Sequence, residues 1–147
     1  MSQACPVSFK QVDENAARIN AVLSAVSVML FLVTSYKFIM FFLVIDFFIR
    51  GFIDPLYSFY SAVSKSFLRM LSIRPKLIEG SPKIFAAKMG FVFSALIILF
   101  AVMDIQIVVR TIGIALIIFA MLEGTFGICV GCNIYSFIER YKKTQRN

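Results

Sequence analysis

The chain has 147 residues, of which 60% are hydrophobic and 16% are charged. Soluble domains average about 45–50% apolar and about 25% charged residues, so this composition favours one membrane-embedded domain over residues 1–147. The net charge of +7 has no nucleic-acid recognition motif beside it, so we expect no nucleic-acid partner. The absence of histidine excludes histidine-ligated haem and every catalytic site that needs a histidine base.

The first apolar block runs from about residue 19 to residue 52. One helix over this block would measure about 50 Å, whereas a bilayer core about 30 Å thick needs about 20 helical residues. Two crossing helices fit the block, at about 17–35 and 37–53, with a tight turn at Ser35, Tyr36 and Lys37. The sequence therefore predicts two crossings here.

Residues 54–83 connect this block to the next one. Within the segment, apolar residues recur at helical spacing, and polar residues occupy the other face of the same predicted helix. A helix with an aromatic-rich apolar face and basic residues on its polar face is typical of the membrane interface, although a helix that caps the bundle in water is the alternative. The apolar positions are Leu56, Phe59, Tyr60, Val63, Phe67 and Leu71, and the polar positions are Ser58, Ser61, Lys65 and Ser72.

The second apolar block predicts two further spans, at about 84–103 and 107–129, separated by Met-Asp-Ile-Gln at 103–106. Neither predicted turn contains glycine or proline, so two long tilted helices are the alternative to four short ones. The fold class that we predict is an all-α membrane protein. It has four transmembrane helices in two hairpins, with an amphipathic interfacial helix between them.

Lysine and arginine lie almost entirely on one side of this predicted topology. The N-terminal segment, the connecting segment and the C-terminal tail carry them, against Lys37 and Arg110 on the other side. Cytoplasmic flanking segments carry an excess of these residues. We therefore expect a multi-pass protein of the cell membrane with both termini in the cytoplasm and the lipid bilayer as its surroundings.

Ionisable residues in the cytoplasmic half of the predicted spans form a candidate buried charge cluster. Asp46 and Arg50 are four residues apart on one helix and can pair. Carboxylates in a span are costly unless they face the bundle and have partners, which favours a functional role. A structural clamp that fixes helix register is the alternative. The residues concerned are Arg18, Asp46, Arg50, Lys88 and Glu123.

Cys129 and Cys132 form a Cys-x-x-Cys motif at the end of the fourth predicted span. In a continuous helix they would share a face, and the basic tail would favour the thiolate. A cytoplasmic position argues against a permanent disulfide. Transient thiol chemistry, metal binding and inert packing remain open. Since a zinc site needs four ligands and only Cys5 and carboxylates such as Glu123 or Glu139 could complete it, we assign no metal site.

Four stretches carry a resemblance to a known family: "CPVSFKQVDENAARINA", "IDFFIRGF", "SPKIFAAKMG" and "LEGTFGICVGCNIYS". They resemble, in that order, the blocks of a bacterial integral-membrane family known as domain of unknown function 4395. The resemblance implies a membrane protein and carries no established activity. It also implies a sulfur-handling role with a thioredoxin-like or sulfurtransferase protein as partner.

The leading hypothesis is therefore a thiol-active membrane protein, in which Cys129 and Cys132 form a candidate redox pair. Asp46 and Glu123 would tune or relay protons. A small transporter or channel subunit, forming a homo-oligomer and using the same carboxylates, is the alternative. A structural membrane scaffold is a third hypothesis. The sequence indicates no particular cofactor or substrate.

Overall fold

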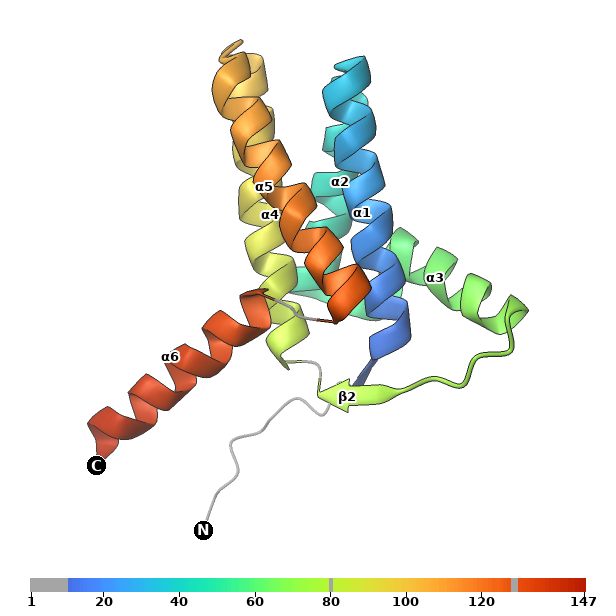
Figure 1. Cartoon of the computed structure of the whole chain (residues 1–147), viewed down its shortest axis with the longest axis vertical. Helices are drawn as coiled ribbons and strands as arrows, with labels where there is room; N and C mark the ends of the chain where they lie inside the picture. The colour runs from blue at the N-terminus through green and yellow to red at the C-terminus, as the bar shows by residue number, and fades with distance from the viewer. Residues whose placement is uncertain (1–10, 80, 128–129) are drawn as a thin grey trace.

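The structure is a computed structural model that describes residues 11–79, 81–127 and 130–147, and this part of the chain is mostly helical, with six α-helices. Three of them are long and apolar enough to cross a membrane, which is consistent with the prediction of a multi-pass membrane protein. These helices are α1 (Glu14–Thr34), α4 (Ser81–Val102, apolar from Lys83) and α5 (Gln106–Phe126). In Figure 1 they stand roughly side by side.

Two residues in the left-handed conformation, Ser35 and Asp104, form the short turns that the sequence predicts between helices. Ser35 has φ 57° and ends α1, with its amide donating to the Phe31 carbonyl at 2.7 Å. Asp104 has φ 63° and lies between α4 and α5. Aspartate tolerates this region better than most residues because its short side chain bonds locally. The turns therefore form without glycine or proline.

Helix α2 (Lys37–Phe48) continues directly into a π-helical turn, η1 (Ile49–Ile53). The wider turn is seen in the backbone, where the Asp54 amide donates to the Ile49 carbonyl at 2.9 Å, five residues back. Alone, α2 has 12 residues, fewer than the roughly 17–25 that a crossing helix uses. Together, α2 and η1 cover residues 37–53, the range of the second predicted span.

Helix α3 (Phe59–Met70), which follows the short 3₁₀ turn η2 (Pro55–Tyr57), is the amphipathic helix of the connecting segment. Its buried residues are Tyr60, Ser61, Ser64 and Leu68, and the serine face packs against α1. Phe59, Val63, Phe67 and Met70 are exposed. The serines face the bundle because α1 offers hydrogen-bonding partners there, which an amphipathic pattern alone does not reveal.

A small antiparallel sheet joins the connecting segment to the start of α1, and the sequence did not predict it. Strand β1 (Gln11–Asp13) pairs with β2 (Leu77–Glu79), with Val12 opposite Ile78. Beside the sheet, the Glu14 amide donates to the Lys76 carbonyl at 2.9 Å. The sheet therefore returns the end of the connecting segment to the N-terminus of α1.

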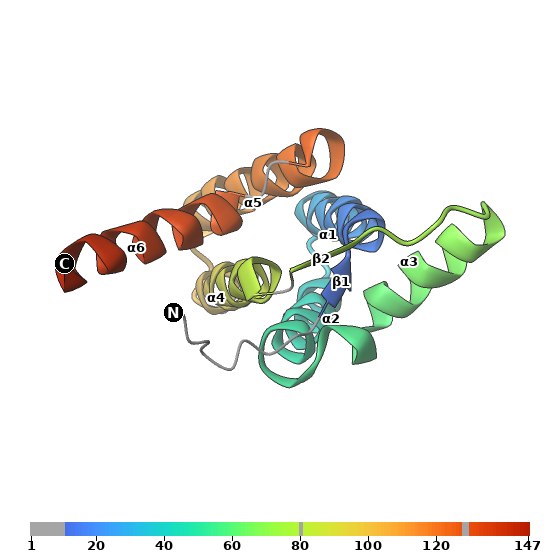
Figure 2. The same cartoon turned by 90° about the horizontal axis from the view of Figure 1, so that it is seen from below.

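The fourth predicted span ends earlier than expected. Helix α5 stops at Phe126, because Gly127 adopts the left-handed conformation, φ 67°, that commonly ends helices. A separate helix, α6 (Val130–Arg146), follows and extends away from the bundle in Figures 1 and 2. A Cβ on Gly131 would lie 2.9 Å from the Ala86 Cα, so glycine permits the close approach of α6 to α4.

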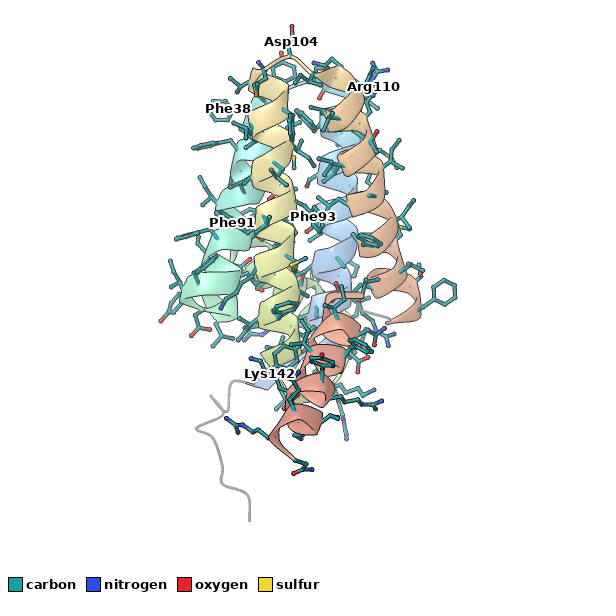
Figure 3. All side chains as sticks on the ribbon, turned by 90° about the vertical axis from the view of Figure 1, so that its left-hand side faces the viewer. Phe38, Phe91, Phe93, Asp104, Arg110 and Lys142 are labelled. Atoms are coloured by element: carbon teal, nitrogen blue, oxygen red, sulfur yellow. The ribbon has the colours of Figure 1, made fainter. Side chains whose placement is uncertain are left out.

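The core lies between the long helices, and much of the outer surface is apolar. Phe38 is 82% exposed, Ile107 81% and Val33 80%. Figure 3 shows phenyl rings projecting outward between an end marked by Asp104 and Arg110 and the opposite end, where Lys142 lies on α6. Exposed apolar surface of this extent marks a membrane or protein contact. The best buried core residues are Val28, Met40, Leu43 and Ile97.

Candidate functional site

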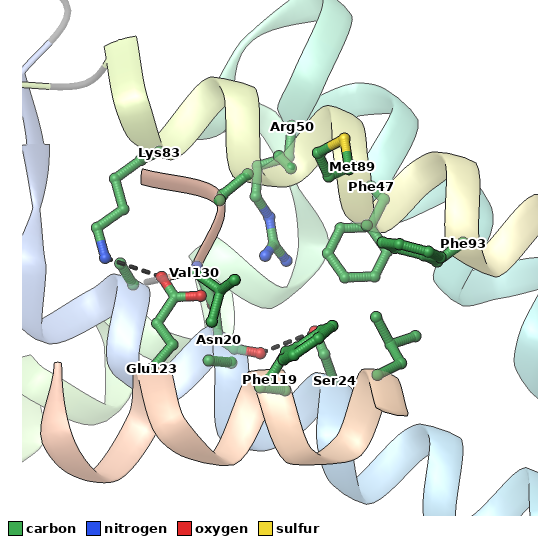
Figure 4. Close-up of a pocket in the computed structure, with 18 of the residues that line it drawn as sticks. Asn20, Ser24, Phe47, Arg50, Lys83, Met89, Phe93, Phe119, Glu123 and Val130 are labelled. Carbon is green, nitrogen blue, oxygen red and sulfur yellow. Dashed lines mark hydrogen bonds and ion pairs between the residues drawn. The ribbon is translucent and has the colours of Figure 1, made fainter. Parts of the chain in front are cut away.

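A cavity of about 320 Å³ lies among α1, α4, α5, the end of α2 and the start of α6 (Figure 4). Its walls are mainly apolar, with the aromatic rings of Phe47, Phe93 and Phe119 among them. A few polar side chains also line it. They are Asn20, Ser24, Arg50, Ser61, Lys83 and Glu123.

Glu123 is paired with Lys83 at one end of the cavity. The Lys83 Nζ lies 2.8 Å from the Glu123 Oε1, and the two side chains are 12% and 20% exposed, respectively. The ion pair joins α4 to α5 and is drawn as a dashed line in Figure 4. Sequence reasoning identified Glu123 but not its partner, because no local spacing links residues 40 positions apart.

Asp46 is a buried carboxylate with partners on both oxygens. It is 2% exposed, and its Oδ2 accepts a hydrogen bond from Arg50, the pairing that their spacing allows. Its Oδ1 accepts from the Ser58 hydroxyl at 2.5 Å and from the Tyr60 backbone N–H at 3.2 Å. Since these donors belong to the N-terminus of α3, the negative charge of Asp46 also lies near the positive end of the helix dipole, which stabilises it. The geometry is that of a clamp between α2 and α3.

Arg50 differs from Asp46 because its guanidinium lines the cavity. It comes from the π-helical turn η1, and its Cζ lies 5.2 Å from the centre of the Phe47 ring. Within the described part of the chain, its buried Nε has no hydrogen-bond partner. The guanidinium therefore retains a donor beyond its ion pair with Asp46.

A polar network that the sequence analysis missed joins α1 to α3. The Asn20 side chain, in a residue 4% exposed, donates to the Ser61 hydroxyl at 3.1 Å and accepts from the Ser64 hydroxyl. About two turns further along α1, the Ser27 hydroxyl lies 2.6 Å from the Tyr60 hydroxyl. Burial raises the pKa of Tyr60 above its ordinary value of 10.0, so its hydroxyl stays protonated. The only sequence signal was an asparagine inside an apolar run.

The remaining residues of the predicted charge cluster lie elsewhere. Arg18 pairs with Glu14 at 2.8 Å, and a Cβ on Gly127 would lie 2.6 Å from its Nη2, which places the guanidinium at the C-terminal end of α5. Lys88 is exposed, with its Nζ 5.4 Å from the centre of the Phe52 ring. The structure therefore brings Arg50 and Glu123 to one cavity and places Arg18 and Lys88 outside its lining.

The cysteine motif is only partly covered by the structure. Cys5 and Cys129 lie outside the described residues, and Cys132 is the third residue of α6. Val130 and Gly131, the two residues between the cysteines, line the cavity. Among the described residues, no three cysteine, aspartate or glutamate side chains gather in a way that could hold a metal ion.

The family model described as "Domain of unknown function (DUF4395)" matches residues 12–140. The chain belongs to this family. The match confirms the resemblance inferred from the sequence blocks. No curated protein and no solved structure matches the chain. Because the DUF4395 description assigns no activity, functional hypotheses depend on the side chains described above.

Proposed function

We propose that the chain crosses the membrane four times, in two hairpins, with α3 lying in the interface. The second crossing would consist of α2 and η1, which together cover residues 37–53. The outward apolar side chains of the bundle support this arrangement (Figure 3). The exposed face of α3, which carries Phe59, Val63 and Phe67, would lie against lipid.

In this topology the two termini and residues 54–83 face the cytoplasm. Arg110 lies at the end of the bundle opposite Lys142, in agreement with the asymmetric distribution of basic residues (Figure 3). The test uses a cysteine-free chain with either Asp104→Cys or Ser72→Cys, labelled in intact cells with a membrane-impermeant maleimide. We expect labelling from outside at position 104 alone. Labelling from outside at position 72 would show that the protein has the opposite orientation.

The proposed activity is thiol–disulfide exchange, or sulfur transfer, by Cys129 and Cys132. The observation that supports it is the position of the motif: α5 ends at Phe126, α6 begins at Val130, and Cys132 falls in the first turn of α6. Helix N-termini and nearby cations lower thiol pKa values and favour the reactive thiolate. The basic tail of α6 provides a surface for a cytosolic thioredoxin-like or sulfurtransferase partner.

The exchange needs no further reactant. One cysteine thiolate attacks a sulfur of the partner's disulfide and forms a mixed disulfide, while the partner's other sulfur leaves as a thiolate. The second cysteine then attacks the mixed disulfide. The products are a Cys129–Cys132 disulfide and a partner dithiol. Glu123, on the cavity that Val130 and Gly131 also line, is the proposed proton acceptor.

The experiment is maleimide mass-tagging of the cysteines in intact membranes, combined with Cys129→Ser, Cys132→Ser and the double variant. We expect one single variant to accumulate a mixed disulfide and the double variant to form none. Cys5→Ser is the matched control and should behave as the unchanged chain. Thiols that stay reduced and unlabelled, or a partner adduct that survives the double replacement, would refute the proposal.

A transporter or channel subunit is the second candidate, favoured by the ionised Lys83–Glu123 pair on a cavity between helices. Asp46 does not support this role, because both of its oxygens are occupied. Glu123→Gln should then reduce substrate flux in proteoliposomes, and Asp104→Asn, at an exposed turn, should not. Unchanged flux in Glu123→Gln would exclude a role for this carboxylate in transport.

A further inference from the structure

The cavity has the size and walls of a site for a small apolar molecule. Its volume of about 320 Å³ is at the lower end of the roughly 300–1,000 Å³ typical of small-molecule sites. Phe47, Phe93, Phe119, Leu116 and Met89 form much of the wall. An occupant would therefore bury mostly hydrocarbon or ring surface.

The polar groups of α1 and α3 that line the cavity are already used within the protein. The Ser24 hydroxyl donates to the Asn20 carbonyl at 2.9 Å, and the Asn20 amide donates to Ser61. Arg50 is different, since its buried Nε has no acceptor within the described residues. The π-helical turn η1 carries this guanidinium to the cavity wall. A molecule in the cavity would thus meet the guanidinium of Arg50 in mainly apolar surroundings, with the Lys83–Glu123 ion pair at one end.

Charge balance decides what kind of head group fits that donor. Arg50 is neutralised by Asp46, and Lys83 by Glu123, so these four side chains carry no net charge. An anionic head would add an uncompensated negative charge to a buried site, which is costly. A neutral carbonyl oxygen accepts the hydrogen bond without that cost.

We propose that the cavity binds a neutral, lipid-soluble carbonyl compound whose oxygen accepts a hydrogen bond from Arg50. The proposal does not rest on the thiol activity proposed above, because the binding argument uses no cysteine. Its position beside Val130 and Gly131 places the bound molecule next to the cysteine motif.

The experiment measures tritiated 2-decanone bound to the full-length protein in detergent micelles, with empty micelles as background. Unlabelled 2-decanone, decanoate and decane compete, so that chain length is constant and only the head group changes. We expect saturable binding in which the ketone competes about tenfold better than either other compound, the effect of one hydrogen bond to a charged donor. Equal competition by decane would show a cavity that accepts hydrocarbon chains without recognising a head group. Stronger competition by decanoate would show an anion site. Either result, or the absence of saturable binding, overturns the proposal.

Two variants locate the binding. Arg50→Lys keeps the positive charge beside Asp46 but removes the guanidinium donors, and it should weaken ketone binding about tenfold without affecting decane. Ala120→Phe fills the cavity from α5 and should abolish binding, whereas Ala62→Phe, at an exposed position of α3, should not. Circular dichroism checks that each variant is folded. Full ketone binding in a folded Ala120→Phe protein would place the site elsewhere.

Discussion

The Ser58 hydroxyl donates a 2.5 Å hydrogen bond to the Asp46 carboxylate, and this contact ties the N-terminus of α3 to α2. Ser58 is the N-cap of α3, with its own side chain accepting from the Ser61 amide. One buried carboxylate therefore organises a helix cap and, through Arg50, an ion pair. The sequence favours a functional role for Asp46, whereas in the structure both of its carboxylate oxygens have hydrogen-bond partners within the fold.

Replacing Asp46 should destabilise the bundle strongly. Asp46→Asn removes the charge opposite Arg50 and leaves a buried guanidinium without its partner. Breaking a buried pair in this way typically costs about 3–5 kcal/mol. Unfolding in mixed detergent micelles, followed by circular dichroism, measures the loss, and Asp104→Asn is the matched control. Equal stability of the two variants would contradict the clamp.

The Lys83–Glu123 ion pair should show a measurable coupling energy. Because the two side chains are only partly exposed, we expect about 1–2 kcal/mol between them, more than a fully exposed pair gives. A double-mutant cycle with Lys83→Met and Glu123→Gln isolates this term. Strictly additive effects would mean that the pair does not hold α4 to α5.

The polar network around Asn20 should stabilise the packing of α3 against α1. Asn20→Ala removes the side-chain partner of the buried Ser61 and Ser64 hydroxyls and leaves Ser64 only its bond to the Tyr60 carbonyl, at a cost of about 1–3 kcal/mol. Hydrogen–deuterium exchange should then rise in residues 59–70 and change little in α5. Asn133→Ala, at an exposed position of α6, is the control. Unchanged exchange in α3 would show that its serine face does not depend on Asn20.

The close contact of α6 with α4 should not tolerate a side chain at position 131. In Gly131→Leu the new Cβ would meet the Ala86 backbone, and overpacking of this kind costs about 1–3 kcal/mol. We expect faster tryptic cleavage within α6, because local unfolding becomes easier. Asn133→Leu, two residues further on and exposed, controls for the added bulk. Equal cleavage of both variants would exclude a specific α4–α6 contact.

Some features could be predicted because they depend on neighbours along the chain. Hydropathy and helix length located the long apolar helices to within a few residues, and the four-residue spacing of Asp46 and Arg50 anticipated their ion pair. The sequence does not predict the end of α5 at Gly127, because an apolar run that continues past this glycine favours one continuous helix. The thiol chemistry of Cys129 and Cys132 stays a prediction.

By itself, then, the sequence determined the apolar helices, their short connections, the local ion pair and the family, since each follows from the order of residues along one segment. The tertiary structure alone decided that the serines of α3 face α1, that Lys83 is the partner of Glu123, and that Arg50 reaches a cavity. In a chain this apolar, hydrophobicity does not distinguish the face that meets lipid from the face that meets another helix. That choice depends on shape and hydrogen-bond partners between segments distant in sequence.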